Sequence, residues 1–371
     1  MEQIRRLVGP SIDWAFTLRA AAEHGVAPLL LRTLSSLGAD AAPSAQFASL
    51  KDYVRAASVR ALVRAAELIR ILETLSAAGI QAIPYKGPVL AAQAYGDLAL
   101  REFEDIDLIL RQKHIVVADR VLCSMGYSRE FPPVFVPGQR SSLIPGEYNY
   151  RDNQRRLIVE LHTERTLRHF PSVPDLDALS HRLACVCLSG HDVRTFSPED
   201  TLVFLCVHGS KDFWQRLIWV SDVAELIGAY PAIDWDGVYR FASAVRAGRI
   251  LHVGLALADG LFQISLPDRI RSRINVDATA GSIAAQMQQS LLSREPLPLG
   301  ARATFAYRRR MAAGALAGLS YAIRLATAPA AEDWQSMRLP RPLAPLYSAL
   351  RPLRLLKKYG GSKQPSATPP L

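Results

Sequence analysis

Two aspartates, Asp105 and Asp107, stand one residue apart in an apolar stretch and are the first candidates for chemistry in this sequence. In a β-strand alternate side chains share a face, so both carboxylates project to one side while Ile106 and Leu108 face the core. Like charges this close repel unless a cation lies between them. Mg²⁺ or Mn²⁺ fits such a site, because hard ions bind carboxylates together with substrate phosphates. The alternative is an exposed strand edge with solvated charges.

A third carboxylate, Glu160, lies in a second alternating stretch, residues 157–162, where it shares a face with His162. Three carboxylates complete a two-metal arrangement, in which one ion activates an attacking hydroxyl and the other neutralises a departing pyrophosphate. We therefore expect Asp105, Asp107 and Glu160, from two strands, to be both the catalytic residues and the metal ligands. The alternative for Glu160 taken alone is an ordinary acid of an alternating strand, which is commonplace.

The turn Lys86-Gly87-Pro88 lies between an expected strand and an expected helix. A glycine there allows the backbone to approach a phosphate closely, and the following helix end attracts anions. Lys86 adds a point charge. The turn is therefore a candidate for binding the phosphates of a nucleotide.

These segments belong to a longer pattern: Lys86-Gly87-Pro88, Tyr95-Gly96-Asp97, Leu100-Arg101, Asp105-Ile106-Asp107-Leu108 and Val159-Glu160-Leu161-His162. The pattern resembles the uncharacterised nucleotidyltransferase family of the DNA polymerase β-like superfamily. The resemblance continues through His208-Gly209, residues 217–222, Asp234-Trp235 and residues 351–355, so it covers nearly the whole chain.

The resemblance implies an enzyme that depends on Mg²⁺ or Mn²⁺ and moves a nucleoside monophosphate from a nucleoside triphosphate to an acceptor hydroxyl, releasing pyrophosphate. Asp105 and Asp107 match the paired metal ligands, Glu160 matches the third acid, and Gly87 matches the glycine of the phosphate turn. Arg101 matches an arginine before the carboxylate strand, which either contacts a phosphate or pairs with Glu104 or Asp97. The acceptor is left open between a small molecule, a peptide or protein, and RNA.

The sequence departs from the superfamily pattern at Pro88, where serine or a second glycine is usual, and in a longer spacing to Asp105. Proline has no amide proton, so one phosphate contact is missing. An inactive nucleotide-binding or scaffold protein is therefore a first alternative. A toxin-like enzyme that modifies tRNA is a second, favoured by the basic C-terminal segment.

The elements that must position these residues predict an α+β fold. Residues 1–79 form a helical segment, 80–195 the polymerase β-like nucleotidyltransferase core of a mixed sheet with helices, 196–335 a large helical domain, and 336–371 a basic, Pro-rich tail. We expect the arginines and lysines after Asp333 to be solvated and residues 360–371 to be disordered. Three tryptophans of the helical half are expected to pack its core, with base stacking as the alternative: Trp214, Trp219 and Trp235.

The composition restricts which partners and which cellular compartment are expected. The formal net charge of +10 suits a polyanionic partner, and no uncharged apolar run is long enough for a membrane span. The four cysteines form no disulfide or zinc pattern, which favours a cytoplasmic protein. The Cys185-Val-Cys187 pair is expected to be buried. His208 and His252 are expected to be core histidines.

Overall fold

The computed structural model describes residues 12–38, 41–129, 147–164, 166–293, 300–328, 333, 339, 343 and 346–360. These fall into two compact units, one holding the described residues up to 293 and the other those from 300 onward. Parts of two expected strands, residues 130–131 and 143–146, and residues 361–371 of the expected disordered end lie outside the described residues. No helix among the described residues is long and apolar enough to cross a membrane.

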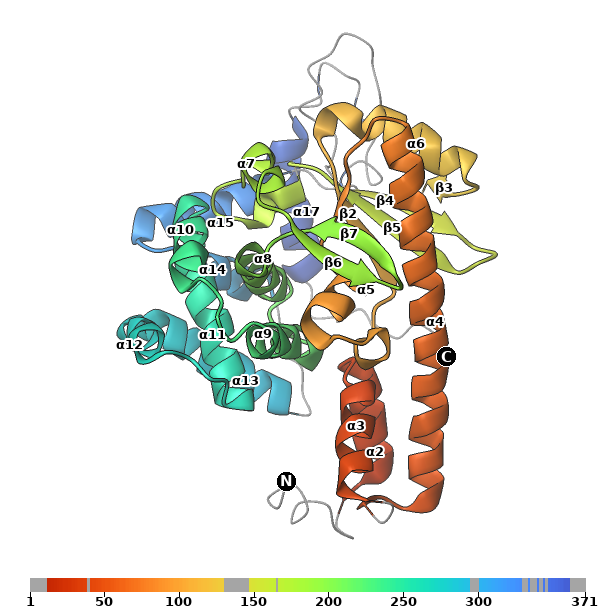
Figure 1. Ribbon diagram of the computed structural model, residues 1–371. Helices are drawn as coiled ribbons and strands as arrows, with labels where there is room; N and C mark the ends of the chain where they lie inside the picture. Colours follow the sequence, from red (N-terminus) through yellow and green to blue (C-terminus); the bar gives the residue numbers. More distant parts are fainter. Residues whose placement is uncertain are drawn as a thin grey trace. The chain divides into compact units, whose positions relative to one another are not determined.

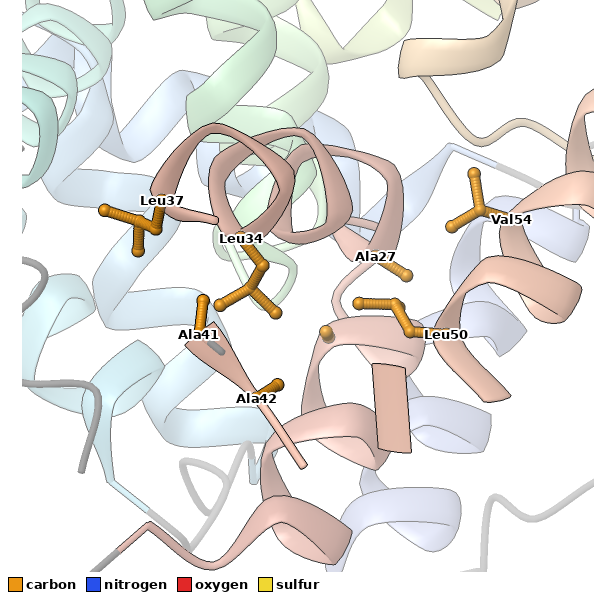
Figure 2. Close-up of a cluster of buried hydrophobic side chains, with 8 residues drawn as sticks. Ala27, Leu34, Leu37, Ala41, Ala42, Leu50 and Val54 are labelled. Atoms are coloured by element: carbon orange, nitrogen blue, oxygen red, sulfur yellow. The ribbon is translucent and has the colours of Figure 1, made fainter. Parts of the chain in front are cut away.

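The N-terminal helices are α2 (Trp14–Glu23), α3 (Ala27–Leu37) and α4 (Ser44–Ala77). Asp13 begins α2 by accepting a hydrogen bond from the Phe16 amide. The three helices share an apolar cluster that includes Leu34 and Leu50, 2% and 3% exposed (Figure 2). Burial of this cluster packs α2 and α3 against the first half of α4, the long helix of Figure 1. The expected N-terminal helical segment is confirmed.

The site is built on a five-stranded mixed sheet with the order β1-β2-β5-β4-β3. Its strands are β1 (Ile83–Pro84), β2 (Asp105–Ile109), β3 (Ser128–Arg129), β4 (Glu147–Asp152) and β5 (Leu157–His162). The central strands β2 and β5 are parallel, and the other pairs are antiparallel. The second half of α4 contacts β2, so the mixed sheet with covering helices that the sequence predicts is confirmed.

Between β1 and β2 the chain forms the short helix α5 (Gly87–Leu90), the π-helix η2 (Ala91–Tyr95) and the 3₁₀ turn η3 (Leu98–Leu100). The π-turn departs from the plain helix expected over residues 89–95, but Gly96 ends it in the left-handed region as expected, with φ 68°. After β2 come η4 (Gln112–His114) and α6 (Ile115–Ser124).

A two-stranded hairpin, β6 (Ala184–Leu188) and β7 (His191–Thr195), follows the short elements η5 (Thr166–His169) and α7 (Leu176–Ser180). The Thr195 hydroxyl donates to the Pro84 carbonyl over 2.6 Å, which attaches the hairpin to the end of β1. The expectation of buried Cys185 and Cys187 is wrong, because both lie on the exposed face of β6 while Val186 between them is buried.

Six helices complete the first unit: α8 (Pro198–Lys211), α9 (Leu217–Ala229), α10 (Trp235–Ala244), α11 (Gly248–Phe262), α12 (Asp268–Val276) and α13 (Ala278–Leu292). Ser197 begins α8 by accepting from the Asp200 amide, as its sequence predicts. Trp214 and Trp235 are buried in this region, whereas Trp219 lines a pocket described below. The large C-terminal helical region expected from the sequence is confirmed.

The second unit contains α14 (Ala301–Met311), α15 (Ala315–Thr327) and α17 (Leu346–Gly360). Part of the segment expected to be a solvated tail is therefore helical. Arg351 and Arg354 both pair with Asp333, which is 4% exposed. These two arginines are not simply solvated, because a buried carboxylate stabilises both.

Candidate functional site

The two carboxylate strands lie side by side in parallel register, with Asp105 opposite Ile158 and Asp107 opposite Glu160. Alternation sends Ile106 and Leu108 into the core, 1% and 0% exposed. Asp107 is itself only 2% exposed, which excludes a solvated strand edge. The sheet thus brings residues more than fifty positions apart in the sequence into one cluster.

Asp107 is the centre of this cluster. Its Oδ1 lies 2.7 Å from the Lys86 ammonium and 3.0 Å from Nε2 of His162. Nε2 of His162 also lies 3.4 Å from Oε2 of Glu160. Oδ2 of Asp107 is buried and accepts no hydrogen bond from the described residues. A buried, unsatisfied carboxylate oxygen is costly in a native structure unless a ligand completes it.

Electrostatics keep Asp107 ionised. Burial alone would raise its pKa, but the charge of Lys86 and the hydrogen bond from His162 together hold the pKa of Asp107 well below its ordinary value. Burial likewise opposes the charge on Lys86, yet the carboxylate of Asp107 raises the Lys86 pKa well above its usual range. Each partner therefore favours the charged form of the other.

The charges around Asp107 also shift the pKa of Asp105. The Asp107 carboxylate and, secondarily, burial raise the pKa of Asp105 to about 6. Glu160 contributes to this rise, while Lys86 and Arg101 oppose it. This is the repulsion between neighbouring carboxylates that the sequence predicts, and a bound cation would relieve it.

The residues present fit a divalent cation. Ligand atoms of Asp107, Glu160 and His162 all lie within 4.8 Å of one another. Asp105, expected as a ligand from the sequence, is outside this tight group but next to it on β2, whereas His162 is inside it. Three oxygen-bearing carboxylates with an unsatisfied Oδ2 on Asp107 match the donor preference of Mg²⁺ or Mn²⁺.

The glycine turn follows directly after β1. Lys86 precedes α5, and Gly87 has φ +54°. A Cβ at Gly87 would lie 2.9 Å from the carbonyl oxygen of Asp105, so the glycine allows α5 to approach the start of β2. Pro88 occupies the first turn of α5, where a missing amide proton costs no helical hydrogen bond.

Arg101 is held by a partner that the sequence did not indicate. Its Nε and Nη2 donate to the two oxygens of Asp222 over 2.7 and 2.9 Å, and the Tyr95 hydroxyl donates to the same carboxylate over 2.7 Å. The expected partners Glu104 and Asp97 make no ion pair with it. Burial opposes the charge of Arg101, but Asp222 raises its pKa above the ordinary value.

A pocket of about 270 Å³ opens beside these residues. The pocket is lined by Lys86, Gly87, Arg101, Asp105 and Asp107. Glu160 does not line it, but its carboxylate lies near His162, which also lies near Asp107. The pocket thus joins the carboxylates and the glycine turn in one cavity.

Sequence reasoning missed several other residues that line the pocket. They are Arg60 and Arg64 of α4, Arg216, and the aromatic residues Tyr53, Phe103 and Trp219. His208 also lines the pocket, contacts the Trp219 ring at 5.4 Å between centroids, and is kept neutral because burial and then Lys86 lower its pKa. The four-residue spacing of Arg60 and Arg64 was the available signal, but it is common on exposed helices.

Comparisons with known proteins give one family match and two distant structural matches. The model of a family described as "Uncharacterised nucleotidyltransferase" matches residues 10–263. The solution structure of the antibiotic-resistance factor ANT(2'')-Ia is 12% identical and covers 50% of this chain and 91% of its own, with a TM-score of 0.35. An antigenic nucleotidyltransferase-like protein from Paracoccidioides brasiliensis is 17% identical and covers 60% and 91%, also with a TM-score of 0.35. No curated protein matches the chain.

Proposed function

Because the chain belongs to the uncharacterised nucleotidyltransferase family, we propose that it moves a nucleoside monophosphate from a nucleoside triphosphate to an acceptor hydroxyl. In this reaction the bond from the acceptor oxygen to the α-phosphorus forms as the bond to the bridging oxygen breaks. Pyrophosphate leaves with the electron pair, and the hydroxyl proton passes to solvent.

The proposed metal ligands are Asp105, Asp107 and Glu160, with His162 as a neighbour that orients Asp107. Mg²⁺ or Mn²⁺, when bound, supplies positive charge to the phosphates and acidifies the acceptor hydroxyl. The observation that carries the proposal is the buried, unsatisfied Oδ2 of Asp107 beside Glu160 in register.

The remaining residues position the substrate. Lys86, which already pairs with Asp107 at the pocket wall, is proposed to contact the phosphates, and Gly87 leaves its backbone accessible to them. Arg101 lines the same pocket, and we propose that it adds positive charge toward the phosphates while Asp222 fixes its orientation. Because phosphoryl chemistry requires little covalent participation, such positioning and charge stabilisation are the main catalytic contributions.

The test is the double variant Asp105→Ala, Asp107→Ala. Calorimetry with ATP and Mg²⁺ measures binding, and an assay of pyrophosphate release measures turnover. We expect the wild type to release pyrophosphate in the presence of cell extract as the acceptor source, and the double variant to lose turnover while its circular dichroism spectrum is unchanged. Full turnover in the double variant would contradict the proposal, and binding without release in the wild type would favour the inactive scaffold.

A further inference from the structure

Helix α4 presents two arginines, Arg60 and Arg64, one turn apart to the pocket. Arg64 is 8% exposed, and its Nε donates to the Glu104 carbonyl over 3.0 Å. Neither arginine makes an ion pair with any residue that the structure describes. Both guanidinium groups therefore line the pocket without a direct ion pair to a described residue, and Glu102 in the same lining interacts with Arg60 only through its charge.

A buried cation without a carboxylate partner is unusual, because its desolvation is not offset. Burial lowers the pKa of Arg64, and the charge of Arg60 lowers it further, so Glu104 and Asp105 do not fully compensate. In the buried Arg101 this desolvation is offset, because the guanidinium group donates hydrogen bonds to both carboxylate oxygens of Asp222. Arg64 has no such partner among the described residues, and Arg60, one turn away on the same helix, is exposed.

The position of these charges indicates what the missing partner is. Arg64 is bonded to the residue just before Asp105, so the guanidinium pair lies next to the carboxylate strand. Arg216, whose Nε donates to the Glu23 carbonyl over 3.1 Å, brings a third cation to the same pocket. An extended polyanion with one end at the carboxylates would reach these guanidinium groups, and guanidinium groups bind phosphate oxygens bidentately.

We propose that Arg60 and Arg64 bind the β- and γ-phosphates of the nucleoside triphosphate, which makes α4 the pyrophosphate-binding side of the site. The inference rests on the proposed function, because it places the α-phosphate at Asp105 and Asp107. It also assigns a role to the N-terminal helices, because α2 and α3 share an apolar core with α4, the helix that carries both arginines.

The experiment compares the full-length variants Arg60→Gln, Arg64→Gln and Arg55→Gln. Arg55 is the matched control, because it lies on an exposed position of the same helix and does not line the pocket. Calorimetry measures the dissociation constants of ATP, AMP and inorganic tripolyphosphate, and thermal melting checks the fold. Arg60 is exposed, so its variant keeps the test valid even if Arg64→Gln destabilises the protein.

We expect Arg60→Gln and Arg64→Gln each to weaken ATP and tripolyphosphate binding by about tenfold or more, the loss typical of one charged hydrogen bond, and to leave AMP binding nearly unchanged. Arg55→Gln should bind all three ligands as the wild type does. Unchanged ATP and tripolyphosphate binding in both pocket variants, equal losses for ATP and AMP, or no binding of either polyphosphate to the wild type would overturn the inference.

The result separates this inference from the proposed function. If the arginine variants lose polyphosphate binding but the wild type never releases pyrophosphate, the polyphosphate site stands and nucleotidyl transfer fails. If the wild type turns over and the arginine variants bind triphosphate normally, nucleotidyl transfer stands and the assignment of α4 fails.

Discussion

The two carboxylate oxygens of Asp107 have different surroundings. One oxygen receives Lys86 and His162, while the other is buried without a partner. The ammonium of Lys86 offsets the negative charge of this carboxylate. The free oxygen keeps a place at which a cation can bind.

Glu160 is the residue whose role in metal binding is most open to test. Titration of Mn²⁺ followed by electron paramagnetic resonance should show at least about tenfold weaker binding in Glu160→Gln, because even the loss of a residue that only orients a metal ligand usually costs that much. Glu73→Gln, an exposed acid on α4, is the control and should bind Mn²⁺ normally. Equal affinity in Glu160→Gln and the wild type would remove Glu160 from the site.

Asp222 stabilises the fold through two buried partners, Arg101 and Tyr95. Breaking a buried ion pair by removing one charge costs about 3–5 kcal/mol, so Asp222→Asn should lower the free energy of unfolding by that order. Urea unfolding measures it, and Tyr95→Phe, which removes one neutral donor, should cost less. A loss as small as that of a surface substitution would show that Arg101 finds another partner.

At the scale of elements, alternation made the carboxylate strands predictable. Strand β5 has the predicted bounds, residues 157–162, and β2 forms the end of the predicted stretch, because apolar residues at every second position leave little choice of face. The hairpin β6–β7 was missed, since its exposed cysteines break the usual polar alternation. The π-turn and the Arg101–Asp222 pair depend on tertiary contacts, which cannot be predicted from the local sequence pattern.

Two glycines with positive φ, Gly87 and Gly96, can be compared by replacing each with alanine. Gly96→Ala should lower the free energy of unfolding by about 1–2 kcal/mol. Its added methyl group meets no atom, so the cost is only that of an alanine at positive φ. Gly87→Ala should cost more and reduce turnover, because its methyl group would press on the Asp105 carbonyl at 2.9 Å. Denaturant unfolding and pyrophosphate release measure both. Equal stability and equal activity of the two variants would contradict the close approach of α5 to β2.

Glu67 connects α4 to the sheet edge and makes that connection sensitive to pH. It accepts from Tyr127 over 2.6 Å and pairs with Arg70 and Arg155. Burial opposes its charge, but the hydrogen bonds of Arg70 and Tyr127 and the nearby guanidinium charges lower the Glu67 pKa below its ordinary 4.5. A lowered pKa contributes stability above pH 4.5, which is lost as the pH falls through the folded-state value.

Glu67→Gln should therefore destabilise the protein by about 1–3 kcal/mol at neutral pH, the cost of weakening charged hydrogen bonds. The difference from the wild type should shrink as the pH falls below 4.5. Guanidinium unfolding over a pH series measures it. A difference independent of pH would mean that the Glu67 charge contributes nothing.

At the scale of the whole molecule, the candidate site belongs to the first compact unit. All the site residues and the family match over residues 10–263 lie within it. Net charge alone, +10 over the chain, predicted a polyanionic partner but did not locate its binding site. The fold supplies a candidate location, because arginines of α4 and carboxylates of β2 line one pocket.

The central claim concerns which part of the nucleotide is transferred, and isotope labelling tests it most directly. Wild-type protein would be incubated with Mg²⁺, cell extract and ATP labelled either at the α-phosphate or at the γ-phosphate, beside the Asp105→Ala, Asp107→Ala variant. Nucleotidyl transfer predicts α-label joined covalently to an acceptor and γ-label in pyrophosphate, with neither product above background in the variant. Gamma-label on the acceptor, or no transferred label at all, would contradict it.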